Sequence, residues 1–387
     1  MHKIQYPIND SKLKDFKKEF ENAIISSKRI DINKIQQFLG TVGITEPFVD
    51  IILMPLEKLI TLNPLSNTSI FTGLSKLKKK NKKDKIKSLF KYAQFQQSEL
   101  SNFFMKYDDI LKIYGCCYCG IDFINSYIPF NNDYRDFEHF MNECTEEDLM
   151  KIYGVGKDSA DIIISDYKGK ITNYGDISDG LNNRINNILK KLTDSSGQLK
   201  YDNLRIDKNN SFTLDHLLPQ SEYPYLSLSL FNLVPSCYSC NSKLKGKKNI
   251  YLSLEELNYT SPSGSKRLTD LIFKIYFKTG FDNKNLPREL NEYSVKIESK
   301  FPEYFKIFNL QGRYNFHKNI SQELISKRRI YSDSKIKEIS NFFKGDGVTI
   351  SENEIKNQIF GSDVFAEDSN KPFQKYKKDI AKQLKLI

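Results

Sequence analysis

Several features that would assign the chain to a class are missing from its 387 residues. The longest apolar stretch, residues 51–60, is interrupted by Pro55, Glu57 and Lys58, and it is shorter than the roughly 18 apolar residues of a membrane-spanning helix. The first six residues lack the apolar core of a signal peptide. Neither repeats nor a Gly-x-x-x-x-Gly-Lys-Ser/Thr phosphate-binding loop is present. These absences predict a cytoplasmic protein with no membrane partner, in which any ATP-dependent control comes from a partner subunit.

Negative charge is also in short supply. The chain has 48 acidic residues against 59 lysines and arginines, which gives a formal net charge of +11. Such a surplus favours a polyanionic partner, because each phosphate that is neutralised releases counterions. A surface of merely solvated lysines explains the same charge equally well. Hydrophobic residues make up 39% of the chain, as in ordinary globular proteins, and the length predicts two or three domains.

Cysteine is scarce enough for its positions to be informative. Four of the six cysteines form two Cys-x-x-Cys pairs, Cys116 with Cys119 and Cys237 with Cys240. In a reducing cytoplasm such pairs are typical of metal ligands rather than of disulfides. Two pairs complete a closed tetrahedral zinc site, which has no open position for water and is therefore structural. The alternative is that the pairs occur by chance and bind no metal. Of the other two cysteines, Cys117 is expected to be a spare thiol and Cys144 a small, buried apolar residue.

The two pairs are separated by far more than the roughly 15–20 residues of a plain zinc ribbon, which predicts a folded insertion at about residues 121–205. Within it, the segment Leu149–Ile162 resembles a helix-hairpin-helix motif. Gly154 and Gly156 permit a tight turn, and Lys157 adds positive charge where the second helix begins, so the motif predicts contact with a phosphate backbone. A plain pair of antiparallel helices without any DNA contact is an equally good interpretation.

The rest of the chain has a coarser pattern. Residues 10–110 are predicted to be mainly helical, with Phe16, Phe20 and Ile24 on one face. After residue 250 the pattern is mixed, and residues 272–277 fit either a strand or a helix. Arg313, one helical turn before His317, is expected on a solvated helix face. A solvated loop is predicted where lysines crowd together, at Lys76, Lys78, Lys79, Lys80, Lys82, Lys83, Lys85 and Lys87.

The residues around the second cysteine pair carry the chemistry. The run from Phe212 to Leu214 alternates like a short half-buried strand, and Asp215 and His216 follow it directly. Because neighbours in a regular strand face opposite ways, the strand must end or bend here if both side chains serve one centre. Asn241, directly after Cys240, falls in the first turn of a predicted helix. Carboxylate and amide oxygens are hard ligands, so the inferred unit is two strands, a loop and a helix around one divalent ion.

These residues resemble those of HNH endonucleases with the ββα-metal fold, in the branch whose finger is held by two Cys-x-x-Cys knuckles. The match is strong over 116–120 and 212–248. The stretches 215–220, 223–224 and 231–241 resemble a subset of bacterial HNH proteins that are often encoded beside ATPases in anti-phage defence or restriction loci. The resemblance therefore implies hydrolysis of DNA phosphodiester bonds, an effector role in defence, and an ATPase or other sensor subunit as a partner.

The resemblance also implies roles for single residues. His216 would be the general base that takes a proton from the attacking water. Asp215 and Asn241 would ligate one catalytic Mg²⁺ or Mn²⁺ ion. Asn232 would form hydrogen bonds across the loop and hold the strand ends. Four lysines after the second knuckle would lie close to the phosphate that is cut, namely Lys243, Lys245, Lys247 and Lys248.

The sequence thus predicts an α+β nuclease with three parts. These are a helical N-terminal region (1–110), an HNH domain (111–250) that is split by the helical insertion, and a mixed C-terminal domain (251–387). Two alternatives remain open. The same site could cut RNA, or the chain could be a catalytically idle, zinc-held DNA-binding subunit.

Overall fold

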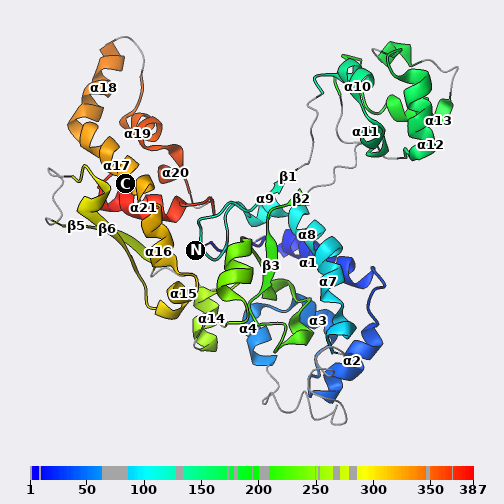
Figure 1. Cartoon of the computed structure of the whole chain (residues 1–387), viewed down its shortest axis with the longest axis horizontal. Helices are drawn as coiled ribbons and strands as arrows, with labels where there is room; N and C mark the ends of the chain where they lie inside the picture. Colours follow the sequence, from blue (N-terminus) through cyan, green and yellow to red (C-terminus); the bar gives the residue numbers. More distant parts are fainter. Residues whose placement is uncertain are drawn as a thin grey trace. The chain divides into compact units, whose positions relative to one another are not determined.

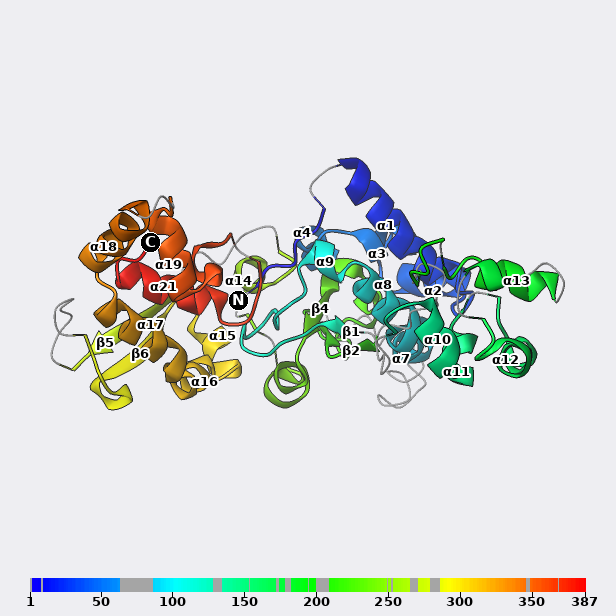
Figure 2. The ribbon, with the colours of Figure 1, turned by 90° about the horizontal axis from the view of Figure 1, so that it is seen from above.

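The computed structural model describes residues 2–7, 10–62, 86–127, 134–152, 154–171, 174–177, 182–193, 195–199, 209–248, 250–251, 253–264, 271–278, 286–345, 349–367 and 369–387. Over these residues the chain is mixed α+β, with many short helices and three two-stranded sheets. It divides into two compact units, residues 1–125 with 210–387 (unit 1) and residues 126–209 (unit 2) (Figures 1 and 2). The range of unit 2 nearly coincides with that of the expected insertion. The predicted N-terminal region, the rest of the predicted HNH domain and the predicted C-terminal domain all belong to unit 1.

The N-terminal part of unit 1 is helical, as its periodicity predicted. Its helices are α1 (Asp10–Ile25), α2 (Ile32–Thr41), α3 (Phe48–Leu53), α4 (Leu56–Leu59), η1 (Ile60–Leu62), α7 (Tyr92–Phe95), η2 (Gln96–Leu100), α8 (Ser101–Lys106) and α9 (Asp108–Leu111). The predicted face of α1 is buried, and Phe16 and Phe20 both pack on Phe103 of α8, at ring distances of 5.0 and 4.9 Å. Seven lysines of the expected solvated loop lie outside the described residues, while Lys87 is exposed.

A small hairpin follows the N-terminal helices in unit 1. Strand β3 (Thr213–His216) pairs antiparallel with β4 (Leu233–Ser236), with Asp215 opposite Val234. The loop between the strands contains two 3₁₀ turns, η6 (Pro224–Leu226) and η7 (Leu230–Asn232), and a short π-helical segment, η8 (Ser239–Lys245), follows β4. The order of two strands, a loop and a helix is the predicted one, and β3 does end at His216.

The C-terminal part of unit 1 combines a second hairpin with helices. The pattern at residues 272–277, which fitted strand or helix, is strand β5 (Ile272–Phe277), paired antiparallel with β6 (Tyr293–Glu298). Helix α21 (Gln374–Gln383) packs on β5, where the Asp379 carboxylate accepts a 3.0 Å hydrogen bond from the Phe273 amide. The other helices are α14 (Leu254–Thr260), η9 (Leu290–Glu292), α15 (Pro302–Ile307), α16 (Leu310–Phe316), α17 (Lys318–Ile330), α18 (Asp333–Gly345), α19 (Glu352–Phe360) and α20 (Ser362–Phe365).

Unit 2 has an apolar core of its own, which includes Phe137, Phe140 and Leu149. Its elements are β1 (Ser126–Tyr127), α10 (Phe137–Glu143), α11 (Glu146–Met150), α12 (Lys157–Ile162), η3 (Ile163–Tyr167), η4 (Tyr174–Asp176), α13 (Asn183–Leu189) and β2 (Asn209–Asn210), which pairs with β1. The unit carries 15 acidic and 11 basic residues, so the positive surplus of the chain belongs entirely to unit 1.

No helix among the described residues has both the length and the apolar character that crossing a membrane requires.

A cluster of hydrogen bonds at the start of α11 stabilises unit 2. The Asp148 carboxylate accepts hydrogen bonds from the Thr145 amide at 3.0 Å and from the Tyr134 hydroxyl at 2.8 Å, and it pairs with Lys151. Burial raises the pKa of this carboxyl, but the hydrogen bonds outweigh burial and lower it to about 2. Stability from Asp148 is therefore present above its ordinary pKa of 3.8 and is lost as the pH falls towards 2.

We expect Asp148→Ala to lower the free energy of unfolding of unit 2 by about 2 kcal/mol at neutral pH, since it removes both a helix cap and a buried acceptor. Hydrogen exchange of the amides in α10 to α12 measures this loss in the full chain. Asp161→Ala, at an exposed position of α12, is the matched control. Equal exchange in both variants would contradict the role given to Asp148.

Candidate metal centre and the polar site beside it

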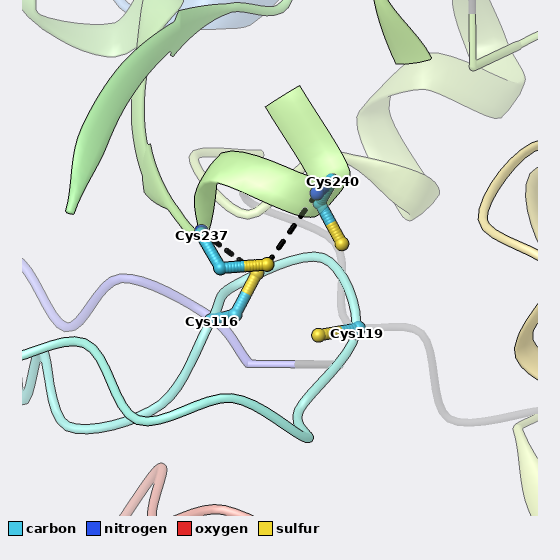
Figure 3. Close-up of side chains that lie close together, drawn as sticks. All are labelled: Cys116, Cys119, Cys237 and Cys240. Atoms are coloured by element: carbon cyan, nitrogen blue, oxygen red, sulfur yellow. Dashed lines mark hydrogen bonds between the residues drawn. The ribbon is translucent and has the colours of Figure 1, made fainter. Parts of the chain in front are cut away.

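Two chain segments that are far apart in sequence meet at the four cysteines of the predicted knuckles. Cys116 and Cys119 lie in the loop after α9, Cys237 follows the end of β4, and Cys240 lies in η8. All four side chains are buried, and their sulfur atoms lie within 4.8 Å of one another. Figure 3 shows the four side chains converging from the loop and from the start of the helix.

The donor set fits one tetrahedral zinc ion. Zinc–sulfur bonds of about 2.3 Å place the sulfurs of a tetrahedral site about 3.8 Å apart, which agrees with the observed cluster. Backbone amides support the sulfurs, because the Cys237 amide lies 3.3 Å from the Cys116 Sγ atom and the Ile121 amide lies 3.4 Å from the Cys119 Sγ atom. Four protein ligands leave no open coordination position, so the centre can organise the fold but offers no site for a substrate.

Arg313 on α16 contacts this cluster, in contrast to the solvated position that the sequence predicted for it. Its guanidinium lies 3.3 Å from the Cys240 Sγ atom and 3.5 Å from the Cys119 Sγ atom, and it pairs with Asp122 at 3.0 Å. The error arose because helical spacing places a residue on a face but does not show what that face packs against. Four thiolates around a divalent ion would carry a net negative charge, which the guanidinium would partly offset.

The C-terminal helices also brace the first knuckle. The Tyr304 hydroxyl donates a hydrogen bond to the Tyr118 carbonyl at 2.9 Å, and the Tyr314 hydroxyl donates one to the Cys119 carbonyl at 2.8 Å. Both tyrosines are buried. The backbone of the knuckle is therefore held in place by helices α15 and α16 as well as by its sulfur ligands.

Beside the metal centre, the face of β3 that carries Thr213 and Asp215 packs against η8. Residues two apart in a strand share a face, and residues four apart in a helix lie close together. Accordingly Thr213 accepts a 2.9 Å hydrogen bond from the Asn241 amide nitrogen, and Asp215 pairs with Lys245. Two polar contacts, Thr213 with Asn241 and Asp215 with Lys245, thus join the strand to the helix.

Asp215 is buried, and both of its carboxylate oxygens accept hydrogen bonds. The Lys245 ammonium lies 2.9 and 3.1 Å from its two oxygens, and the Tyr118 hydroxyl donates a hydrogen bond to Oδ2. Burial, together with the neighbouring carboxylate, raises the pKa of Tyr118, which keeps the phenol protonated and able to donate. In the described conformation Asp215 and Asn241 therefore do not form the open oxygen site that the resemblance implied.

His216 faces the opposite side of β3, as strand alternation requires. Its Nε2 atom lies 3.0 Å from the Ser227 carbonyl oxygen, and its ring packs edge-on against Tyr92 at 4.4 Å. A carbonyl only accepts, so Nε2 is the protonated nitrogen and Nδ1 carries the free lone pair of the neutral ring. The residue as a whole is buried, with 9% of its surface exposed. Burial lowers the pKa of His216, although the Ser227 carbonyl opposes this.

Asn232 ties together the loop between β3 and β4, as predicted. Its Oδ1 atom accepts a hydrogen bond from the Leu218 amide at 2.8 Å, and its amide nitrogen donates to the Leu226 carbonyl at 2.9 Å. The side chain is fully buried. It therefore fixes the path of the chain on both sides of η6, just beyond His216.

The four lysines that were expected to lie near a phosphate divide into two groups. Lys243, Lys247 and Lys248 are exposed, and the Lys243 ammonium also lies over the Tyr238 ring at 5.8 Å. The prediction is wrong for Lys245, whose side chain is only 1% exposed and pairs with Asp215. The sequence shows a run of lysines but not the buried carboxylate that draws one of them inward.

The glycine-containing segment of unit 2 does form a turn between two helices. Gly154, with a φ of +89°, lies between α11 and α12, and Gly156 precedes the first residue of α12. Val155 and Ala160 are buried, as the motif requires. Lys157 is exposed and lies 3.9 Å from Glu146, in a unit whose net charge is negative. This charge does not favour a phosphate backbone, so the predicted DNA contact of Gly154, Gly156 and Lys157 stays a prediction.

Two residues beside the site were not singled out in the sequence, and a third was assigned to the wrong surroundings. Tyr118 looked like a spacer of the first knuckle, and Tyr92 like part of a helix. Arg313 was placed on a solvated face. The position of Tyr118 between two cysteines indicated that the folded knuckle would orient its side chain. Spacing along the chain could not show that its hydroxyl would donate to Asp215.

Comparison of the chain with protein families, with curated proteins and with solved structures found no match.

Arg313 provides a test of the metal centre. We expect Arg313→Gln to weaken zinc binding by about tenfold or more, because partners of metal ligands typically contribute that much to affinity. Zinc transfer to a chromogenic chelator measures the change in the purified chain. Arg329→Gln, at an exposed position of α17, is the matched control. Purified protein without zinc, or equal zinc transfer from both variants, would contradict this account of the centre.

Proposed function

We propose that the chain is an HNH-type endonuclease that hydrolyses phosphodiester bonds in DNA. One observation carries the proposal: a cysteine cluster that fits zinc fastens a strand–loop–strand–helix unit in which the Ser227 carbonyl orients His216 through its Nε2 atom. Resemblance to HNH motifs at Asp215, His216, Asn232 and Asn241 supports the same function.

His216 is suited to act as a general base. Its orientation is fixed by the Ser227 carbonyl and by the Tyr92 ring, so the lone pair on Nδ1 has a defined direction. Because burial lowers its pKa, the ring is neutral at neutral pH and can accept a proton from a water molecule. The bonds of Asn232 hold the loop that supplies Ser227.

The charge distribution suits a polyanionic substrate. The positive surplus belongs to unit 1, which also contains His216. Lys243, Lys247 and Lys248 are exposed in and directly after η8 and are available to phosphate oxygens. Contacts of this kind bind the backbone of a nucleic acid without recognising its sequence.

The resemblance to HNH endonucleases implies a divalent cation, which would stabilise charge on the phosphate that is cut. Its implied ligands are Asp215 and Asn241, whose oxygens have the right chemistry for Mg²⁺ or Mn²⁺. Both Asp215 oxygens accept bonds from Lys245 or Tyr118 in the described arrangement. The residues therefore do not fit the ion as they stand, and we assign it no step.

A role in anti-phage defence or restriction, with an ATPase or sensor subunit as a partner, rests on the resemblance alone. It agrees with a chain that has no phosphate-binding loop of its own.

A second candidate function is a zinc-held DNA-binding subunit without hydrolysis. The observation that favours it is the arrangement of Asp215 and His216, which face opposite sides of β3 and have separate partners. An acid that is neutralised by a buried lysine contributes nothing to cleavage.

Cleavage of supercoiled plasmid and of single-stranded RNA, with Mg²⁺ or Mn²⁺ or with EDTA added only during the assay, separates the candidates. We expect the wild-type chain to convert plasmid to nicked or linear forms. His216→Ala should reduce this rate by about 10²–10⁴-fold, the usual contribution of a general base, while gel retardation of DNA is unchanged.

His139→Ala in unit 2 is the matched control and should cut like the wild type, and zinc content and melting temperature show whether each variant is folded. Retardation of DNA without cleavage under any condition would support the idle subunit. Cleavage of RNA but not of DNA would support the other alternative. Full activity in His216→Ala would overturn the assignment of the base.

A further inference from the structure

The buried side chain of Lys245 has an unusual set of partners. Its ammonium lies 2.9 Å from Asp215 Oδ2 and 3.1 Å from Asp215 Oδ1, and it donates a 2.8 Å hydrogen bond to the His216 carbonyl. Three oxygen atoms of the end of β3 thus surround one positive charge. The lysine is 1% exposed, which excludes solvent from the pair.

We propose that the Lys245 ammonium is the resident cation of this polar site, and that Asp215 is its fixed partner rather than a ligand for a divalent metal. This inference rests on the contacts of β3 and η8 and not on the proposed nuclease activity. It replaces the metal ligand set that the sequence predicted.

Both carboxylate oxygens of Asp215 already have donors. Lys245 approaches both carboxylate oxygens, and the Tyr118 hydroxyl takes a further position on Oδ2. A divalent ion could bind this carboxylate only if Lys245 withdrew. That withdrawal would leave the buried Lys245 ammonium without its carboxylate, and an unpaired buried charge is among the most destabilising changes in a protein interior.

The register between β3 and η8 separates Asn241 from Asp215. Asn241 lies opposite Thr213 and donates a hydrogen bond to it, while Lys245 lies one helical turn further on, opposite Asp215. Gly246 then ends the helix at a φ of +52°, and its amide donates a hydrogen bond to the Asn241 carbonyl at 2.8 Å. The Asn241 side chain therefore lies beside Thr213 rather than beside Asp215, so the two residues are not positioned to share an ion.

Tyr118, the other donor to Asp215, is also held in a fixed position. Tyr118 is fully buried within the first knuckle, and its ring stacks on Phe308 at 4.7 Å. The knuckle therefore fixes the hydroxyl that holds Asp215 Oδ2. Zinc centre, carboxylate and lysine form one continuous assembly in which Asp215 has no freedom to turn towards an added ion.

Binding of Mn²⁺ to the zinc-loaded full chain tests this inference, with the signal of free Mn²⁺ in electron paramagnetic resonance as the readout. We expect wild type and Asp215→Asn to bind Mn²⁺ equally weakly. Lys245→Ala should bind Mn²⁺ at least about tenfold more tightly, because it frees the carboxylate and leaves space for a hydrated ion. Lys245→Ala/Asp215→Asn should lose this gain, and Lys243→Ala, on the same helix, should resemble the wild type.

Binding of Mn²⁺ by the wild type that is lost in Asp215→Asn would overturn the proposal. Melting temperatures provide a second measurement that does not need Lys245→Ala to fold. Lys245→Met alone should melt well below the wild type, whereas Asp215→Leu/Lys245→Met should recover most of the loss, because buried pairs tolerate joint apolar replacement. No recovery in the double variant would also contradict a fixed pair. Neither readout involves cleavage, so failure of the proposed nuclease function leaves this test intact.

Discussion

The contact between the two cysteine pairs is the constraint on which unit 1 depends. It joins segments more than one hundred residues apart, as the 3.3 Å approach of the Cys237 amide to the Cys116 Sγ atom shows. A metal ion bound here would convert two short loops into a rigid junction, and its binding energy would be folding energy because the site does not exist in the unfolded chain. The hairpin of β3 and β4, with only four residues in each strand, is too small to be stable alone. Its geometry is therefore set by the junction and by the N- and C-terminal helices around it.

That junction extends by direct contacts to the polar groups nearby. Arg313 connects the sulfurs to α16, Tyr118 reaches from the first knuckle to Asp215, and Lys245 completes the charge balance from η8. Each contact pairs a buried charge or hydroxyl with a specific partner, which is the condition under which such groups are tolerated in an interior. The candidate site is thus part of the framework of the fold rather than an addition to its surface.

Much of this arrangement could be predicted from the sequence, for reasons that differ between residues. The cysteine spacing indicated the metal cluster because two Cys-x-x-Cys pairs have few other uses inside a cell. Alternation from Phe212 to Leu214 predicted the strand, and the motif indicated the loop bonds of Asn232. The partners of Asp215 were not accessible in the same way. Spacing along the chain places Lys245 on a helix, but which of four neighbouring lysines turns inward depends on the register between helix and strand, and only the folded chain fixes that register.

The two sides of β3 show why adjacent motif residues need not share one role. Asp215 faces η8, where the nearest positive charge is a lysine, and His216 faces the loop, where the Ser227 carbonyl and the Tyr92 ring orient it. A strand that stays regular up to His216 separates the two side chains by its own thickness, and only a bend within it would bring both to a single ion. The backbone here is paired through His216 and Leu233, so no such bend occurs before the strand ends. His216 and the Asp215–Lys245 pair therefore have different partners: the Ser227 carbonyl orients the histidine, while the ion pair joins β3 to the helix that carries Cys240.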